Sequence, residues 1–194
     1  MRSSPSSNII DAKQSVQEVP YQVLRKQLLQ DGQILEYATP VGVSSSQPEN
    51  QGVPLKSLPG IVIDDEHAQF TGEWIKSHST SRYVGPGYHH DGDKHDGSCT
   101  ARFEAKLPRT GTYEVRMSYS PHPNRATNVP VTLTHSQGMA TATINQREVA
   151  PIDELFISLG QFPFDADQAG VVEISNTDTN GHVIVDTVQW LEVK

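Results

Sequence analysis

The residues of this sequence that could do chemistry are mainly aspartates and histidines, and Asp186 is the most informative of them. In the strand-like segment 184–190, Asp186 falls on the same face as the apolar residues Ile184, Val188 and Trp190, because side chains alternate sides along a β-strand. A carboxylate that faces a core is costly unless it is hydrogen-bonded, paired or bound to a cation. The pattern therefore predicts a buried Asp186 with specific partners.

Asp64 and Asp65 are the expected neighbours of Asp186. They lie in the first predicted strand, residues 61–66, and the first and last strands of a β-sandwich commonly come together. Three readings follow for Asp186. It accepts hydrogen bonds from backbone N–H groups or hydroxyls, which is the reading we favour; it shares a structural Ca²⁺ with Asp64 and Asp65; or it is a binding or catalytic carboxylate.

Residues 88–97 place three histidines and three aspartates within ten residues. The aspartates before Gly97 faintly resemble a calcium loop, but the fixed alternation of oxygen ligands and the terminal bidentate carboxylate are absent. The closed tetrahedral spacing of a zinc site cannot be read from the segment either. We favour a solvated, mobile loop and keep a ligand or metal site as the alternative.

No enzyme motif matches this sequence. A P-loop, a G-x-S-x-G elbow, a G-x-G-x-x-G fingerprint and an H-E-x-x-H helix are all missing. The single cysteine, Cys99, lies in an alternating run and reads as a small core residue rather than a nucleophile. The chain is therefore predicted not to be an enzyme on its own.

Aromatic side chains are the natural candidates for gripping a sugar, because a flat apolar ring rimmed by polar groups fits a pyranose. Tyr83 and Tyr88 flank Gly85-Pro86-Gly87 and are predicted to be surface rings. Trp74 lies in a strand-like context, where a core position is the more frequent outcome, and Trp190 reads as core. Polysaccharide is thus a candidate partner.

Composition excludes several classes of protein. The net charge of −8 and the lack of any basic run argue against nucleic-acid binding. No apolar stretch approaches the about 18 to 20 residues that span a bilayer. One cysteine rules out an intrachain disulfide, and the Ser-rich start lacks the apolar core of a signal peptide. We expect an extracellular or cell-envelope location, with any export signal outside this sequence.

Period-two alternation from Gly60 onward sets the predicted fold class. Tyr113, Val115 and Met117 alternate with polar residues, as do Phe103, Ala105 and Leu107. Turn-forming pairs such as Gln137-Gly138 and Asn180-Gly181 separate the runs. Residues 60–194 are predicted to form an all-β, antiparallel, jelly-roll-like β-sandwich.

The first 59 residues have a different texture. Residues 1–15 are polar and Ser-rich and are predicted to be disordered. In residues 16–38, Leu24, Leu28 and Leu29 recur at helical spacing, Pro20 suits a first turn and Gly32 a stop, which predicts one short amphipathic helix. Residues 39–59 are rich in Pro, Ser and Gly and read as a linker.

Several short motifs in residues 61–193 resemble the golvesin C-terminal-like domain, also called the xanthan lyase carbohydrate-binding-like domain. They are Ile63-Asp64-Asp65, Phe70-Thr71-Gly72-Glu73-Trp74, Gly87-Tyr88, Leu107-Pro108, Gly111-Thr112-Tyr113-Glu114-Val115, Asn124-Arg125-Ala126-Thr127-Asn128-Val129-Pro130, Leu159-Gly160 and Val185-Asp186-Thr187-Val188. The resemblance implies a non-catalytic β-sandwich appended to bacterial enzymes such as polysaccharide lyases. Arg125 and Asn128, which lie in one of these motifs, join Trp74, Tyr83 and Tyr88 as candidate ligand-binding residues.

The stretch from Val19 to Gln33 is similar to the end of a bacterial FAD-dependent oxidoreductase, just before its appended sandwich. The flavin-binding part would then precede residue 1, and no flavin chemistry is expected in this chain. We therefore expect a carbohydrate-binding-like accessory module of a larger enzyme, without a cofactor except for the structural calcium considered above. The alternative is a structural module that docks on a catalytic domain or partner protein through the N-terminal helix.

Overall fold

The computed structural model describes residues 21–28, 34–40 and 51–194, which belong to two units divided between Ser46 and Gln47. In the first unit, β1 (Tyr21–Leu28) pairs antiparallel with β2 (Ile34–Pro40), with Leu28 opposite Ile34. The predicted helix over 16–38 is therefore wrong for the residues that can be described. Gly32, which we took as a helix stop, lies outside the described residues. Residues 1–20, including the predicted disordered segment, lie outside the described residues.

The second unit contains the remaining elements. They are η1 (Leu55–Ser57), β3 (Ile61–Asp64), η2 (Asp65–His67), β4 (Gln69–Thr71), β5 (Ile75–Ser77), β6 (Tyr88–His90), β7 (Asp96–Lys106), β8 (Gly111–Ser118), β9 (Val129–His135), β10 (Gly138–Ile144), β11 (Phe156–Phe164), β12 (Ala169–Thr177), β13 (Ile184–Val185) and β14 (Thr187–Glu192). None of the helical segments in the described part of the chain is long and apolar enough to cross a membrane.

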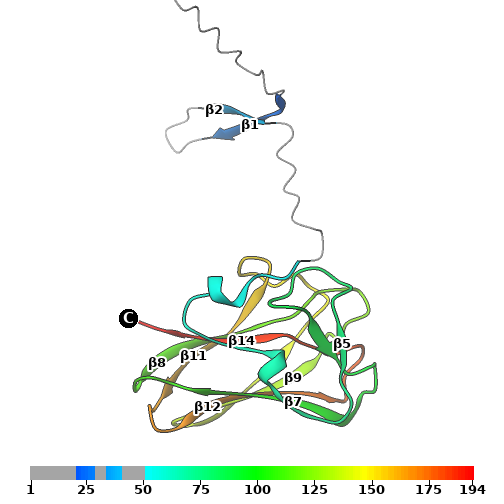
Figure 1. Cartoon of the computed structure of the whole chain (residues 1–194), viewed down its shortest axis with the longest axis vertical. Coiled ribbons are helices and arrows are strands. Elements are labelled where there is room, and N and C mark those ends of the chain that lie inside the picture. Colours follow the sequence, from blue (N-terminus) through cyan, green and yellow to red (C-terminus); the bar gives the residue numbers. More distant parts are fainter. Residues whose placement is uncertain (1–20, 29–33, 41–50) are drawn as a thin grey trace, which may run out of the picture. The chain divides into compact units, whose positions relative to one another are not determined.

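Three antiparallel sheets build this unit. One has the strand order β10-β9-β12-β7-β4, and a second has the order β11-β8-β14-β3. Figure 1 shows these two sheets as the layers of a sandwich, with β7 and β12 in one layer and β8, β11 and β14 in the other. A small third sheet has the strand order β13-β6-β5. The all-β, antiparallel fold class predicted from the alternation is therefore confirmed.

The core follows the alternation seen in the sequence. On β7 and the residue after it, Phe103, Ala105 and Leu107 are buried, while the intervening Glu104 and Lys106 are exposed. The side chains of both sheets merge into one apolar cluster. Cys99 is buried within β7 as a free thiol, which agrees with its predicted core position.

Strand β14 is central in its sheet, between β8 and β3, and it is buried on both faces. Val188 and Trp190 point into the sandwich core, whereas Gln189 lies on the opposite face and its Nε2 donates to the carbonyl of Pro59 at 2.8 Å. Asp186 sits in the break between β13 and β14, where the chain passes from the small sheet to the large one.

The described part of the predicted linker, residues 51–59, is packed rather than free. Val53 forms a parallel bridge with Val84, and Leu55 and Leu58 pack on the buried cluster that contains Val84. A Cβ on Gly52 would lie 2.1 Å from the carbonyl oxygen of Gly85, so only glycine allows this close approach. Pro and Ser content does not reveal that Val53, Leu55 and Leu58 pack on residues that are distant along the chain.

Candidate functional site

Asp186 is fully buried and held by neutral donors. The backbone N–H of Val84 donates to both carboxylate oxygens, at N···O distances of 3.0 and 3.3 Å. The hydroxyl of Ser118 donates to Oδ2 at 2.9 Å, and that of Thr187 lies 3.3 Å from Oδ1. These contacts match the favoured reading of Asp186 as an acceptor of N–H and hydroxyl hydrogen bonds.

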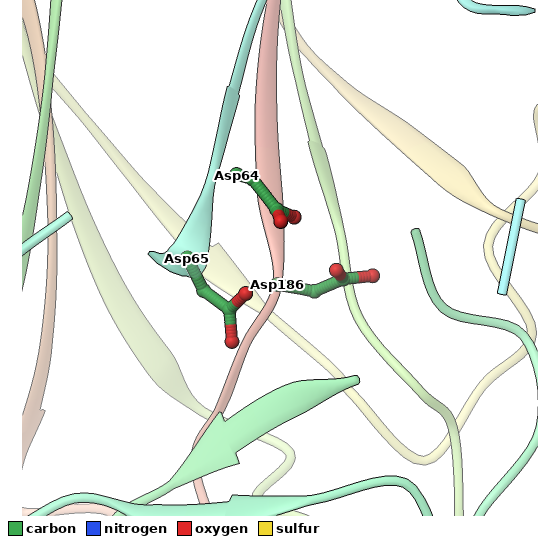
Figure 2. A group of neighbouring side chains, drawn as sticks. All are labelled: Asp64, Asp65 and Asp186. Carbon is green, nitrogen blue, oxygen red and sulfur yellow. The ribbon is translucent and has the colours of Figure 1, made fainter. Parts of the chain in front are cut away.

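Asp64 and Asp65 bring two more buried carboxylates to the same place. Asp64 ends β3 and lies opposite Thr187 of β14, and Asp65 begins the 3-10 turn η2. One ligand oxygen from each of Asp64, Asp65 and Asp186 can be chosen so that all lie within 4.8 Å of one another. Figure 2 shows the three carboxyl groups gathered beside the last strand, as the pairing of first and last strands predicted.

The partners of Asp64 and Asp65 are fewer than their oxygens. The Thr187 hydroxyl donates to Asp64 Oδ1 at 3.1 Å, and His89 Nδ1 lies 2.6 Å from Asp65 Oδ2. Oδ2 of Asp64 and Oδ1 of Asp65 are buried and have no hydrogen-bond partner. Among the described residues, no lysine or arginine forms an ion pair with any of the three carboxylates.

Burial and mutual repulsion disfavour three negative charges here. Desolvation, with a further contribution from Asp65, raises the pKa of Asp64 to about 6. Desolvation also raises the pKa of Asp65, although the hydrogen bond with His89 opposes the shift. The pKa of Asp186 is raised well above its usual range by its complete burial, against the hydrogen bond from Val84. The cluster therefore needs protons or a cation to neutralise it.

The donor set fits a hard cation. It consists of carboxylate oxygens, which Ca²⁺ prefers, and its one neighbouring imidazole is already engaged with Asp65. A Cβ on Gly85 would lie 2.8 Å from Asp64 Oδ2, so the glycine leaves room beside an oxygen that has no partner. Nothing in the sequence around Val84 or Ser118 marked them as part of this site, because they reach Asp186 only through contacts between segments that are distant along the chain.

Tyr83 and Tyr88, predicted to be exposed stacking rings, are core residues. Their exposed fractions are 3% and 1%, and their ring centroids are 6.1 Å apart. The prediction failed because the exposure expected of Gly85-Pro86-Gly87 was extended to its neighbours: Pro86 is exposed, but the tyrosine rings on either side pack in the core. Neither ring can stack on a sugar from its present position.

Trp74 remains partly exposed and belongs to an aromatic cluster that the sequence did not reveal. The Phe70 ring lies 5.4 Å from that of Trp74 and 4.8 Å from that of His89, centroid to centroid. Ile75, the next residue, is 51% exposed. Its register partner is His90 rather than His89, so Ile75 lies on the other face of the β5–β6 pair. We call Phe70, Trp74 and His89 the aromatic patch; its signal in the sequence was only the "F-T-G-E-W" motif, in which the phenylalanine was not singled out.

The segment 88–97, which we expected to be a solvated loop, has a buried anchor. Asp91 is fully buried and accepts hydrogen bonds from the backbone N–H groups of Val183, Asp93 and Lys94 and from the amide of Asn176. The expectation holds only for exposed members such as Asp93 and Lys94. Within the described residues, the histidines of this segment are not part of any cluster of metal-ligating side chains.

A model of the Golvesin C-terminal domain matches residues 61–192, which are the sandwich. The chain belongs to this family. A curated relative, the xanthan lyase of Bacillus sp. (strain GL1), is 31% identical over 160 residues, which cover 79% of this chain and 17% of the lyase.

Solved structures agree with this assignment. The Paenibacillus xanthan lyase superposes with a TM-score of 0.65 at 34% identity, over 69% of this chain and 13% of that chain. The Podospora anserina GH26-CBM35 β-(1,4)-mannanase superposes with a TM-score of 0.52 at 16% identity, over 69% of this chain and 28% of that chain, and this likeness shows the fold alone. The Golvesin C-terminal domain thus spans a small part of the lyases it matches.

Two further candidates of this Golvesin C-terminal domain, Arg125 and Asn128, have structural contacts. Arg125 is 5% exposed; its guanidinium donates to the carbonyl of Ser120 and to the hydroxyl of Tyr88. Asn128 donates to the carbonyl of Asp178 and accepts from the N–H of Asn180, which joins two loops. Arg125 is therefore not available to a ligand, and the polar atoms of Asn128 are already engaged.

Proposed function

We propose that this Golvesin C-terminal domain is a non-catalytic carbohydrate-binding module of a larger bacterial enzyme. Its family membership and its match to a small part of xanthan lyases support an accessory role. Asp91 and Arg125, two of its buried polar side chains, are engaged in holding strands and loops together. The larger enzyme would be a polysaccharide lyase or, as the resemblance of residues 19–33 suggests, an FAD-dependent oxidoreductase.

The aromatic patch is the surface that supports sugar binding best, and it is the observation on which the proposal rests. It consists of the rings of Phe70, Trp74 and His89. Two ion pairs flank it: Lys76 with Glu66, and Lys94 with Glu73. Apolar rings with polar groups at their rim match the mixed surface of a pyranose. The indole N–H of Trp74 already donates to the carbonyls of Thr71 and Thr100, so this ring would contribute its face.

Binding is tested with immobilised and soluble polysaccharides, including xanthan and a β-mannan, by affinity electrophoresis and by tryptophan emission. Trp190 is fully buried, so a ligand on the patch should change the emission of Trp74. We expect Phe70→Ala to weaken retention by roughly tenfold, corresponding to about 1.4 kcal/mol.

Met139→Ala is the matched control. Met139 is 73% exposed and lies on β10, at the opposite edge of the five-stranded sheet from β4, which carries Phe70. Retention that falls equally in Met139→Ala would remove the patch from the proposal. Retention by none of the polysaccharides would contradict carbohydrate binding itself.

A protein-docking role is the second candidate, and the hairpin favours it. Among the described residues, β1 and β2 pair only with each other, and an isolated two-stranded hairpin is marginally stable in water. A partner sheet or surface would stabilise it, in place of the helix that we had expected to dock. Removing residues 1–46 should then abolish association with a catalytic partner and leave polysaccharide retention unchanged.

A further inference from the structure

Hydrogen bonding accounts for only part of the carboxylate cluster. Asp186 has the N–H of Val84 and the hydroxyl of Ser118. The hydroxyl of Thr187 lies within reach of both Asp64 and Asp186, but it has a single proton and can satisfy only one of them at a time. Neutral donors therefore explain the position of Asp186 and leave the cluster as a whole short of donors.

Two carboxylate oxygens of the cluster have no hydrogen-bond donor. Asp64 and Asp65 are each 1% exposed, so water from the surface does not solvate them freely. Oδ2 of Asp64 and Oδ1 of Asp65 have no partner, although buried carboxylate oxygens are normally hydrogen-bonded or bound to a metal. Both atoms belong to the group of three carboxylates in which one oxygen of each lies within 4.8 Å of one oxygen of the others.

Asp91, which is outside the cluster, is a buried carboxylate of the same chain whose two oxygens both have hydrogen-bond donors. Asp91 is as buried as Asp186, and its two oxygens receive three backbone N–H groups and the amide of Asn176. The three-aspartate cluster has no comparable set of donors. The difference indicates that something other than protein N–H and O–H groups completes it.

The chemistry of the ligands selects the kind of cation. Three carboxylates from two chain segments present oxygen atoms, while cysteine is absent and His89 contacts Asp65 on its other oxygen. Zinc sites are dominated by nitrogen and sulfur, whereas Ca²⁺ takes carboxylate and carbonyl oxygens in a flexible geometry. The glycine at position 85 leaves the neighbourhood of Asp64 Oδ2 unobstructed by a side chain.

We propose that Asp64, Asp65 and Asp186 bind one Ca²⁺, which fastens the first strand of the sandwich to the last. Asp64 ends β3 and Asp186 immediately precedes β14, so a shared ion would add to the strand pairing between them. Because the N–H of Val84 also donates to Asp186, the same ion would fix the segment that bridges to Val53. This proposal does not depend on whether the domain binds sugar.

The test uses the full chain, dialysed against EDTA and then against metal-free buffer. Isothermal titration calorimetry with CaCl₂ and metal analysis after gel filtration measure binding directly on the wild-type protein. Binding at about one ion per chain is expected, and at about 100-fold excess of Ca²⁺ over its Kd the melting temperature should rise by roughly 5 to 10 °C. No heat of binding and no rise in the melting temperature would overturn the proposal.

Variants locate the ion. Asp65→Asn keeps the shape of the side chain and removes one charge, and we expect it to weaken Ca²⁺ binding at least about tenfold, since affinity depends on ligand charge. Asp91→Asn is the matched buried control and should keep the wild-type response to Ca²⁺, even if its starting melting temperature is lower. A Ca²⁺ response that survives Asp65→Asn, Asp64→Asn and Asp186→Asn would place the ion elsewhere and refute the assignment. Should one of these variants fail to fold, the other two and the wild-type calorimetry still decide the matter.

Discussion

At the scale of single residues, the buried aspartates differ in how many donors surround them. Asp186 contributes to stability through the N–H of Val84 and the hydroxyl of Ser118. Replacing it by alanine would leave these two donors without their acceptor in a fully buried place, which costs about 1 to 3 kcal/mol for each such group.

We therefore expect Asp186→Ala to lower the free energy of unfolding by roughly 2 to 4 kcal/mol in urea denaturation. Asp186→Asn retains an acceptor oxygen and, in Ca²⁺-free buffer, should lose less than half as much. Asp167→Ala, at an exposed aspartate, is the control and should change stability by less than about 0.5 kcal/mol. Equal and small losses in both Asp186 variants would contradict the role of these hydrogen bonds.

Tyr88 gives the domain a predicted response to alkaline pH. Burial alone would raise the pKa of its phenol, but hydrogen bonds with Ser77, Ser79 and Thr80 and the charge of Arg125 outweigh burial and lower it to about 8. Below pH 8 the phenol is protonated in both folded and unfolded protein and adds nothing. Between about pH 8 and 10 only the folded protein releases the proton, so this group adds stability as the pH rises.

The stability that Tyr88 adds is complete above about pH 10. It reaches at most about 2 to 3 kcal/mol, because the pKa falls from 10.0 to about 8 and each pKa unit corresponds to about 1.4 kcal/mol. Absorbance at the tyrosinate band should show one phenol titrating near pH 8, and Tyr88→Phe should abolish that step. Tyr119→Phe should leave it unchanged, because burial raises the pKa of Tyr119 to about 12. A titration without any step near pH 8 would show that the donors do not outweigh burial.

At the scale of elements, the segment between β6 and β7 is held by Asp91 rather than by its histidines. The carboxylate joins the end of β6 to Val183, just before β13, and to Asn176 of β12. The same carboxylate caps the N–H groups of Asp93 and Lys94 and so fixes the turn that follows. This one side chain therefore ties three parts of the chain together.

Each oxygen of Asp91 accepts two hydrogen bonds, so replacing one oxygen by the NH₂ group of asparagine leaves two of the four donors without their acceptor. We expect Asp91→Asn to lower the free energy of unfolding by roughly 1 to 3 kcal/mol. Asp93→Asn, two residues away and exposed, is the matched control, with an expected change of less than about 0.5 kcal/mol. Equal effects in thermal or urea unfolding would mean that the segment is solvated, as its composition first suggested.

At the scale of the whole molecule, the sandwich depends on a segment that precedes its first strand. Val53, Leu55 and Leu58 pack on the cluster formed by Val84, Leu155 and Phe156, and the carbonyl of Pro59 accepts from Gln189 of the central strand. Val84, on which this segment packs, also donates its N–H to Asp186, so the segment lies next to the carboxylate cluster.

A chain of residues 47–194 should therefore fold and be more stable than one of residues 60–194. We expect a difference of roughly 2 to 4 kcal/mol, since three partly buried apolar side chains contribute about 1 kcal/mol each. Urea unfolding of the two chains measures it, and the substitution Leu58→Ala in the longer chain should reproduce part of the loss. Equal stability of the two chains would show that residues 47–59 do not support the sandwich.

The sequence by itself determined the class of the fold and the faces of its main strands. Alternation identified the buried residues of β7 and β8, and the position of Asp186 among apolar neighbours indicated a buried carboxylate near Asp64 and Asp65. These inferences succeeded because they depend on a period of two along one strand and on the frequent meeting of the first and last strands.

Only the tertiary structure decided which surfaces are covered. Tyr83 and Tyr88 looked exposed beside Gly85-Pro86-Gly87, but both rings pack in the core of the sandwich. The bond from Val84 to Asp186 spans 102 residues and the contact of Phe70 with His89 joins two strands of different sheets. Local pattern cannot specify such contacts, because they depend on how distant segments pack, and the site is built almost entirely from them.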